Sequence, residues 1–270
     1  DGRDVTVTDV SRILPLRGSI AEVVFSLGLG DRVVGRDMTA TFPQAAHLPL
    51  VSRSHDITAE AALALHPTVI LAQSDSGPPE ALDQLRNAGI PVVLVDPPGS
   101  IDDIAPRIRL IAGALGVTAA GEQLIARTNA DIKQAQEKIP TGITPPRVAF
   151  LYLRGQAGVY LLGGPRSGAD SMIAAAGGED AGTAIGLSRS FTPITSEALV
   201  DAAPAILLLT TTGLDSVGGI DGLLAIPGIA QTPAGQNRRV VTVEDGLLYS
   251  FGARTPEALS ILIDKFYGAP

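Results

Sequence analysis

One pattern of polar and apolar positions occurs twice along the chain, at residues 58–72 and 195–209. In each copy a Thr begins a short helical segment with a Glu in its first turn, a Pro ends the segment, and an apolar run of strand type follows. This is the pattern of a helix and strand in an α/β protein. Two copies predict two similar lobes with a ligand cleft between them.

Short apolar runs typical of strands alternate with helical segments along the rest of the chain. The clearest of these runs are residues 69–72, 92–95, 148–153, 206–210 and 240–243, and residues 4–16 are also rich in strand-forming types. The alternation favours parallel sheets covered by helices, in which ligands gather at the carboxyl ends of the strands.

Two helical segments in the middle of the chain divide it. Residues 100–115 carry apolar side chains at helical spacing, Gly116 interrupts the pattern, and a second run extends from Thr118 to about Lys138. The predicted fold is therefore α/β, with two Rossmann-like lobes of mainly parallel sheets joined by a long α-helix. We place the lobes at residues 1–116 and 141–270 and the connecting helix at 117–140.

The first helix is predicted over residues 19–27, just after the β-rich start of the chain. Ser19 and Glu22 have the spacing of a capping box, in which the two side chains bond the free backbone N–H groups of the first turn. Gly28 and Gly30 end the segment.

Composition excludes several classes of function. The 270 residues carry a net charge of -8 and no cluster of Lys and Arg, so binding to nucleic acid is not expected. The chain has no Cys, which removes thiolate metal sites and cysteine nucleophiles. Motifs of serine hydrolases and phosphate-binding loops are also missing, so we expect a binding protein and not an enzyme.

Several motifs together resemble one superfamily, the substrate-binding proteins of ABC importers for iron complexes and vitamin B12. The resemblance covers nearly the whole chain. It rests on the two Glu segments described above and on residues 18–22, 28–35, 89–96, 112–116 and 254–259. Within this class the chain is most similar to the HmuT-type haem-binding lipoproteins of Gram-positive actinobacteria, because it has His55 in a polar loop and the sequence Tyr152-Leu-Arg154 at the end of a strand.

The resemblance implies that His55 and Tyr152 bind the iron of haem b (iron protoporphyrin IX) from opposite faces of the transported ligand. Imidazole and phenolate are both suitable axial ligands of haem iron. Arg154 would favour the phenolate form of Tyr152, since residues two apart on a strand share a face.

Further side chains are candidates for the haem pocket, although helix capping, surface charge or core packing would also explain each of them. Propionates are bound by cations, hydroxyl groups and helix starts, and aromatic side chains can line the pocket. The candidates are Arg17, Ser19, Arg189, Tyr249 and Phe251.

The resemblance also implies partners and a location. Glu60 and Glu197 would dock against an ABC permease dimer with its ATPase, although the helix dipole alone would explain an acidic residue in a first turn. Haem-donor surface proteins are further expected partners. We expect an extracytoplasmic protein with a lipid anchor on the outer face of the cell membrane, whose signal peptide and lipid-bearing Cys lie outside this sequence. A ferric-siderophore or cobalamin binding protein of the same superfamily is the alternative.

Overall fold

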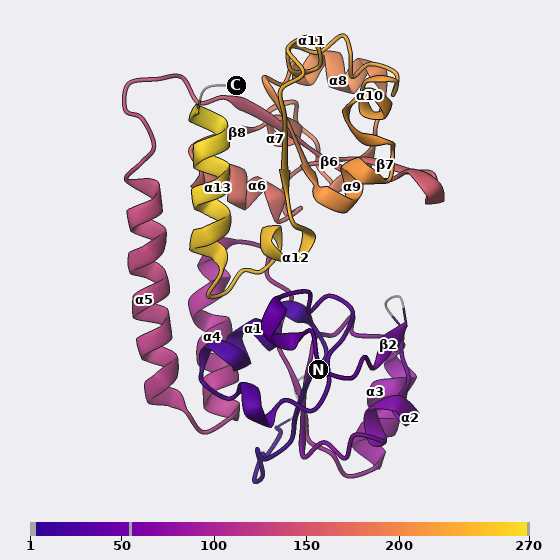
Figure 1. Ribbon diagram of the computed structural model, residues 1–270, viewed down its shortest axis with the longest axis vertical. Helices are drawn as coiled ribbons and strands as arrows, with labels where there is room; N and C mark the ends of the chain where they lie inside the picture. The colour runs from indigo at the N-terminus through magenta and orange to yellow at the C-terminus, as the bar shows by residue number, and fades with distance from the viewer. Residues whose placement is uncertain (1–3, 54–55, 269–270) are drawn as a thin grey trace. The chain divides into compact units, whose positions relative to one another are not determined.

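The structure is a computed structural model that describes residues 4–53 and 56–268 and separates into two compact units (Figure 1). Unit 1 contains the chain up to Pro98 together with residues 102–129 and 250–254, and unit 2 contains residues 99–101, 130–249 and those from Thr255 onwards. The boundary between the units falls within the long helix α5 (Thr118–Gln136).

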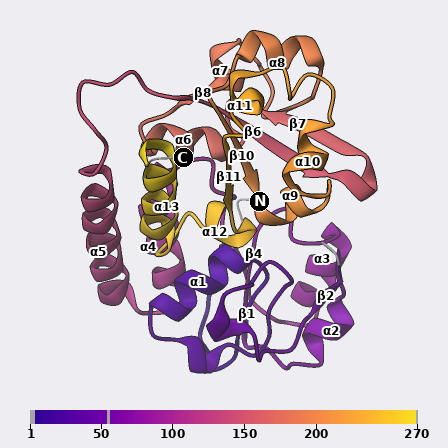
Figure 2. The same cartoon turned by 45° about the horizontal axis from the view of Figure 1, so that its top comes forward.

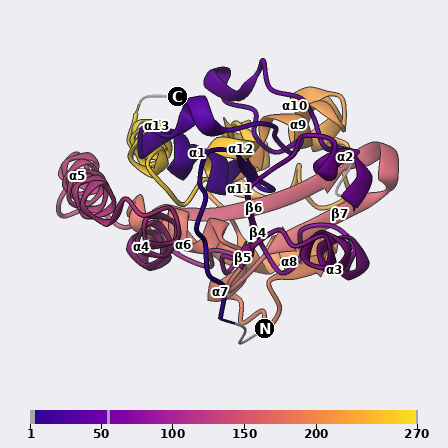
Figure 3. The same cartoon turned by 90° about the horizontal axis from the view of Figure 1, so that it is seen from below.

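Unit 1 is built on a parallel sheet in the order β1-β4-β5. Its strands are β1 (Ile13–Pro15), β4 (Val69–Ala72) and β5 (Val92–Leu94), and they are almost entirely buried, as expected for parallel strands covered on both faces. Figure 3 shows β4 and β5 side by side, with α3 (Pro79–Asn87) next to them.

The other elements of unit 1 surround this sheet. They are α1 (Gly18–Ser26), a two-stranded antiparallel ribbon of β2 (Ser52–Arg53) and β3 (Asp56–Ile57), α2 (Ala59–Leu63) and α4 (Ile104–Ala114). Short 3-10 turns occur at Gly30–Arg32, Pro43–Ala45 and Ile101–Asp103. α2 packs against α3, and α1 packs against α4.

Unit 2 is built on a mixed sheet in the order β11-β10-β6-β7-β9, with β8 also paired to β6. The strands are β6 (Arg147–Arg154), β7 (Val159–Gly163), β8 (Glu179–Asp180), β9 (Phe191–Pro193), β10 (Ile206–Thr210) and β11 (Val240–Val243). β6, β10 and β11 run parallel, side by side (Figure 2). β7 and β9 are antiparallel additions that follow the 3-10 turn Gly155–Ala157.

Helices cover this sheet. They are α6 (Ala169–Ala175), α7 (Ala181–Ala184), α8 (Ser196–Ala202), α9 (Thr211–Asp215), α10 (Gly219–Leu224), α11 (Pro233–Gln236), α12 (Asp245–Leu248) and α13 (Thr255–Tyr267). α7 and α9 pack against β6, and α13 packs against β11. The core of this unit combines fully buried aliphatic side chains of β6 and β10 with others from the helices and loops that cover the sheet.

The predicted α/β class with mainly parallel sheets is confirmed. Two local predictions are wrong. Within residues 4–16, only Ile13–Pro15 pair as a strand. The capping box does not form, because α1 begins at Gly18 and its N-cap residue Arg17 makes no side-chain cap hydrogen bond.

Candidate functional site

Tyr152 and Arg154 lie on the same face of β6 in unit 2. Their neighbours Leu151 and Leu153, which point to the opposite face, are fully buried in the core. The Arg154 guanidinium carbon lies 4.5 Å from the centroid of the Tyr152 ring, which is the geometry of a cation–π contact. The strand therefore presents a phenol and a cation together at its carboxyl end.

Arg154 is held by acceptors on two sides. Its Nη1 donates to the carbonyl oxygen of Leu153 at 2.8 Å, and its Nη2 donates to Oδ1 of Asp245 at 3.1 Å. The Asp245 carboxylate also accepts a hydrogen bond of 2.6 Å from the Thr212 hydroxyl group. Asp245 was not singled out from the sequence, because only the fold brings α12 next to the end of β6.

A chain of aromatic ring contacts begins at Tyr152. The Phe191 ring centroid lies 5.6 Å from that of Tyr152, and Phe150 contacts both Phe191 and Tyr249 with centroids 6.4 Å and 6.1 Å apart. These contacts bring four aromatic side chains from β6, β9 and the end of α12 to one place. Phe150 is fully buried, whereas the other three rings are half-buried and can offer apolar surface to a ligand.

The Tyr249 hydroxyl group is buried, and it has no hydrogen-bond partner within the described part of the chain. Burial raises the pKa of this phenol well above its usual value, and the negative charges that Tyr152 and Asp245 can carry raise it further. Tyr249 therefore remains a neutral hydrogen-bond donor beside Tyr152.

In unit 1, Arg17 stands immediately before α1. Its Nη2 donates to the carbonyl oxygen of Asp75 at 2.8 Å and lies 3.0 Å from an oxygen of the Asp75 carboxylate. Arg17 is thus already engaged by the loop that follows β4, and an anionic ligand would have to share this cation with Asp75.

Arg107 of α4 connects two other candidates in unit 1. It is only 4% exposed, and its terminal nitrogens donate to the Ser19 hydroxyl group and to the carbonyl oxygen of Phe251, each at 3.0 Å. Burial lowers the pKa of Arg107 to about 10, so it remains a cation at neutral pH. Sequence reasoning missed Arg107, although it falls on the apolar stripe that passes through Ile104 and Ile108.

The remaining candidates are placed differently. Arg189 is exposed in the loop before β9 and makes no hydrogen bond or ion pair with the described residues. The Phe251 side chain is 1% exposed and belongs to the packed interior of unit 1. His55 lies outside the described residues.

Glu60 and Glu197 occupy equivalent positions in α2 and α8. The hydroxyl groups of Thr58 and Thr195 cap these helices and accept hydrogen bonds from Ala61 N at 3.2 Å and from Ala198 N at 3.1 Å. Both Glu side chains are exposed.

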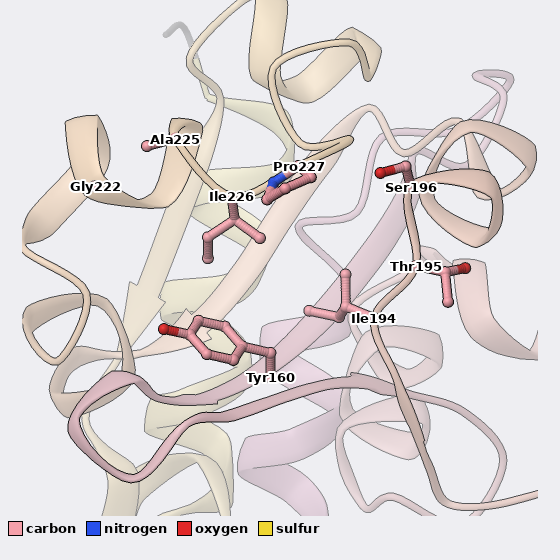
Figure 4. A pocket seen from close by; sticks show the side chains of 8 residues that line it. All are labelled: Tyr160, Ile194, Thr195, Ser196, Gly222, Ala225, Ile226 and Pro227. Atoms are coloured by element: carbon pink, nitrogen blue, oxygen red, sulfur yellow. The ribbon is translucent and has the colours of Figure 1, made fainter.

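Two open cavities lie apart from Tyr152 and Arg154. One, of about 610 Å³ in unit 2, lies beside the start of α8, and Figure 4 shows Tyr160 and Ile226 approaching one another there. The other, of about 650 Å³ in unit 1, is lined by Val92–Leu94 and by residues of α4. Neither contains a predicted haem ligand.

The described residues contain no group of three or more His, Asp or Glu side chains placed to hold a bare metal ion. Within the same part of the chain, no helix combines the length and the apolar character that crossing a membrane requires.

Comparison with known proteins identifies the family. Residues 13–246 match the sequence profile of the periplasmic binding proteins. The chain belongs to the periplasmic binding protein family. This periplasmic binding protein also resembles the ABC transporter substrate-binding lipoprotein YvrC of Bacillus subtilis (strain 168), at 26% identity over 98% of this chain and 83% of YvrC. A shorter match, 36% identical over 37% of this chain and 36% of the other, is to the vitamin B12-binding protein of Yersinia pestis (strain Pestoides F).

Solved structures of haem-binding proteins resemble this periplasmic binding protein over almost its full length. The periplasmic haem-binding protein RhuT from Roseiflexus sp. RS-1 is 42% identical, with a TM-score of 0.91 over 96% of this chain and 98% of RhuT. The haem-binding protein HmuT is 40% identical, with a TM-score of 0.92 over 100% of this chain and 88% of HmuT. The resemblance to HmuT-type proteins that the sequence predicted is therefore confirmed.

Proposed function

We propose that this periplasmic binding protein binds haem outside the cytoplasm and delivers it to an ABC permease for iron acquisition. The observation that carries the proposal is Tyr152 with Arg154 against its ring, at the end of β6, in a chain similar to haem-binding proteins over almost its full length. A phenol beside a cation and among aromatic rings suits a ferric porphyrin.

In this proposal the iron has two axial ligands, Tyr152 and His55. The similar structures include HmuT variants in which a Tyr, a His and an Arg are each replaced by Ala, with the Tyr and the Arg two positions apart. Tyr152 and Arg154 have the same spacing, and the separation of His55 from Tyr152 agrees to within two residues with that in HmuT.

Each side chain has a separate task. Tyr152 binds ferric iron as phenolate, and the Arg154 cation stabilises that negative charge. Phe191 and Tyr249 supply apolar contact and exclude water from the porphyrin. The further pocket residues that we propose are Arg17, Ser19, Arg189 and Phe251, and the cations among them would bind propionates. We also propose that the two lobes comprise residues 1–116 and 141–270 and that residues 117–140 form the helix that connects them.

Titration with hemin tests the axial ligands. We expect a Soret band with a tyrosinate-to-iron charge-transfer band, which Tyr152→Phe abolishes and His55→Ala shifts. Tyr160→Phe and His47→Ala are matched controls. Tyr160 lies on β7 and lines the cavity beside α8, and His47 is exposed in unit 1. If neither ligand variant alters the spectrum, the assignment is wrong.

The alternative ligand is cobalamin or a ferric siderophore, and the partial match to vitamin B12-binding proteins favours cobalamin of the two. A competition experiment with bound hemin tests whether either of these compounds is the preferred ligand. Cyanocobalamin or a ferric siderophore that displaced hemin at equal concentration would favour the alternative.

We further propose that Glu60 and Glu197 dock against the permease dimer and that the protein is lipid-anchored to the cell membrane. Both carboxylates are exposed at capped helix starts, one in each unit, which suits a partner with two similar subunits.

Uptake measurements test the docking role. The double variant Glu60→Gln and Glu197→Gln should impair haem uptake by cells without changing haem affinity. Glu80→Gln is the matched control, because Glu80 is an exposed first-turn acid of α3. A loss of haem affinity in the double variant would place these carboxylates in the haem site instead.

A further inference from the structure

Asp245 connects three elements at the carboxyl end of β6. Its Oδ1 accepts hydrogen bonds from Arg154 Nη2 at 3.1 Å and from the Thr212 hydroxyl group at 2.6 Å, and its Oδ2 accepts one from Thr212 N at 3.3 Å. Arg154 ends β6, Thr212 lies in α9 and Asp245 is the first residue of α12. The carboxylate is thus immobilised from one side and holds the guanidinium on the other.

This contact does little for stability. The side chains of Arg154 and Asp245 are 34% and 29% exposed, and partly exposed ion pairs contribute little to the free energy of folding. Its effect is geometric, because an Arg side chain at the end of a strand has many rotamers. With Nη1 bound to Leu153 O and Nη2 bound to Asp245, the guanidinium group stays against the Tyr152 ring.

We propose that Asp245 is a positioning residue, which holds Arg154 beside Tyr152 so that the cation meets the phenolate when haem binds. The inference rests on the proposed function. It adds a residue that touches neither the ligand nor the iron and acts only through Arg154.

Two substitutions separate position from charge. Asp245→Asn keeps a side-chain oxygen at the place of Oδ1, which makes two of the three hydrogen bonds. Asp245→Ala removes all three and releases the guanidinium group. Asp221→Ala is the matched control, because Asp221 forms an exposed ion pair with Arg238 elsewhere in unit 2.

The experiment measures haem dissociation into excess apomyoglobin, together with the tyrosinate-to-iron charge-transfer band. We expect Asp245→Ala and Arg154→Ala each to raise the dissociation rate about tenfold. Both variants lose the same charge-assisted contact, that between the Arg154 cation and the Tyr152 phenolate. The double variant should dissociate no faster than Arg154→Ala alone. Asp245→Asn should restore the rate to within about twofold of the wild type and keep the charge-transfer band.

Three results would overturn the inference. Asp245→Ala could behave as Asp221→Ala does, the effects of Asp245→Ala and Arg154→Ala could add, or Asp245→Asn could lose as much as Asp245→Ala. The Tyr152→Phe complex tells this failure apart from that of the proposed function. If Tyr152→Phe leaves the spectrum unchanged, both proposals fall; if it abolishes the charge-transfer band while Asp245→Ala has no effect, only the positioning role is wrong.

Discussion

Arg107 in unit 1 and Arg154 in unit 2 are both held at two terminal nitrogens, but they differ in exposure. Arg107 is 4% exposed and bonds Ser19 and Phe251, whereas the Arg154 side chain is 34% exposed and lies against Tyr152. A buried cation with several partners ties segments of the fold together. A partly exposed cation beside a phenol is available to a ligand.

The other candidate arginines of the two units differ in the same way. Arg17 in unit 1 is engaged by Asp75, while Arg189 in unit 2 makes no contact of this kind with the described residues. The comparison teaches that residue type alone does not identify a ligand-binding cation, because hydrogen-bond partners and burial decide which arginine is available.

The largest expected effect comes from Arg107→Ala. This variant should lower the free energy of unfolding by about 3 kcal/mol, because it leaves the buried Phe251 carbonyl and the partly buried Ser19 hydroxyl group without their donor. Arg154→Ala should cost about 1 kcal/mol or less, since its contact is partly exposed. Urea denaturation of both variants measures the difference, and equal losses would contradict the comparison.

The second prediction concerns haem affinity. Arg189→Ala should weaken hemin binding about fivefold, because it removes from a propionate a cation that has no other partner among the described residues. Arg17→Ala should weaken hemin binding less, because the Arg17 guanidinium group is already paired with the Asp75 carboxylate.

Hemin dimethyl ester is the control for this pair, since it lacks the negative charges. The Arg189 effect should disappear with the ester. An Arg17 effect larger than that of Arg189 would reverse the order that we infer from their partners.

Two tyrosine hydroxyl groups of unit 2 differ in whether they make a hydrogen bond. Tyr249→Phe should raise the free energy of unfolding of the ligand-free protein by about 1 kcal/mol, because it removes a buried hydroxyl group without a partner among the described residues. Tyr267→Phe should lower it by about 1 kcal/mol, since the Tyr267 hydroxyl group donates to Gly177 O at 2.7 Å. Thermal denaturation measures both changes. Destabilisation by Tyr249→Phe would contradict the prediction, because it would show that the Tyr249 hydroxyl group makes a hydrogen bond in the folded protein.

The smallest effect concerns Asp37 in unit 1. Burial raises the pKa of this carboxyl group above its usual value, although hydrogen bonds from Thr39 oppose the shift. The folded state therefore binds the proton more tightly than the unfolded state, and stability increases as the pH falls through the folded-state pKa.

Asp37→Asn tests this sign. The variant should melt slightly above the wild type at neutral pH, and its advantage should shrink as the pH falls and the wild-type carboxyl group becomes protonated. An advantage that grew towards low pH would show that the pKa is lowered instead.

Much of the fold was predictable from local patterns. The strand predictions at 69–72, 206–210 and 240–243 agree with β4, β10 and β11, and the helix expected from Thr118 is α5. These elements follow from periodicity and end signals within a few residues. The antiparallel pairing of β7 and β9 was not predicted, since strand direction depends on where the chain returns to the sheet.

The candidate site was predictable only in part. Tyr152 and Arg154 share a face because of strand geometry, which the spacing of two residues implies. Ser19 shows the opposite case, since its expected capping role is wrong and its hydroxyl group instead accepts a hydrogen bond from Arg107. A capping box is a local signal, and a buried cation from another helix can override it.

The sequence by itself determined several strands and helices, among them the repeated helix starts at Thr58 and Thr195, because a cap, a first-turn acid and a closing Pro act over a few neighbouring positions. Only the tertiary structure decided the partners of the arginines. Arg154 meets Asp245 across 91 positions and Arg107 meets Phe251 across 144. Contacts of that range form when sheets and helices pack, so no local pattern could reveal them.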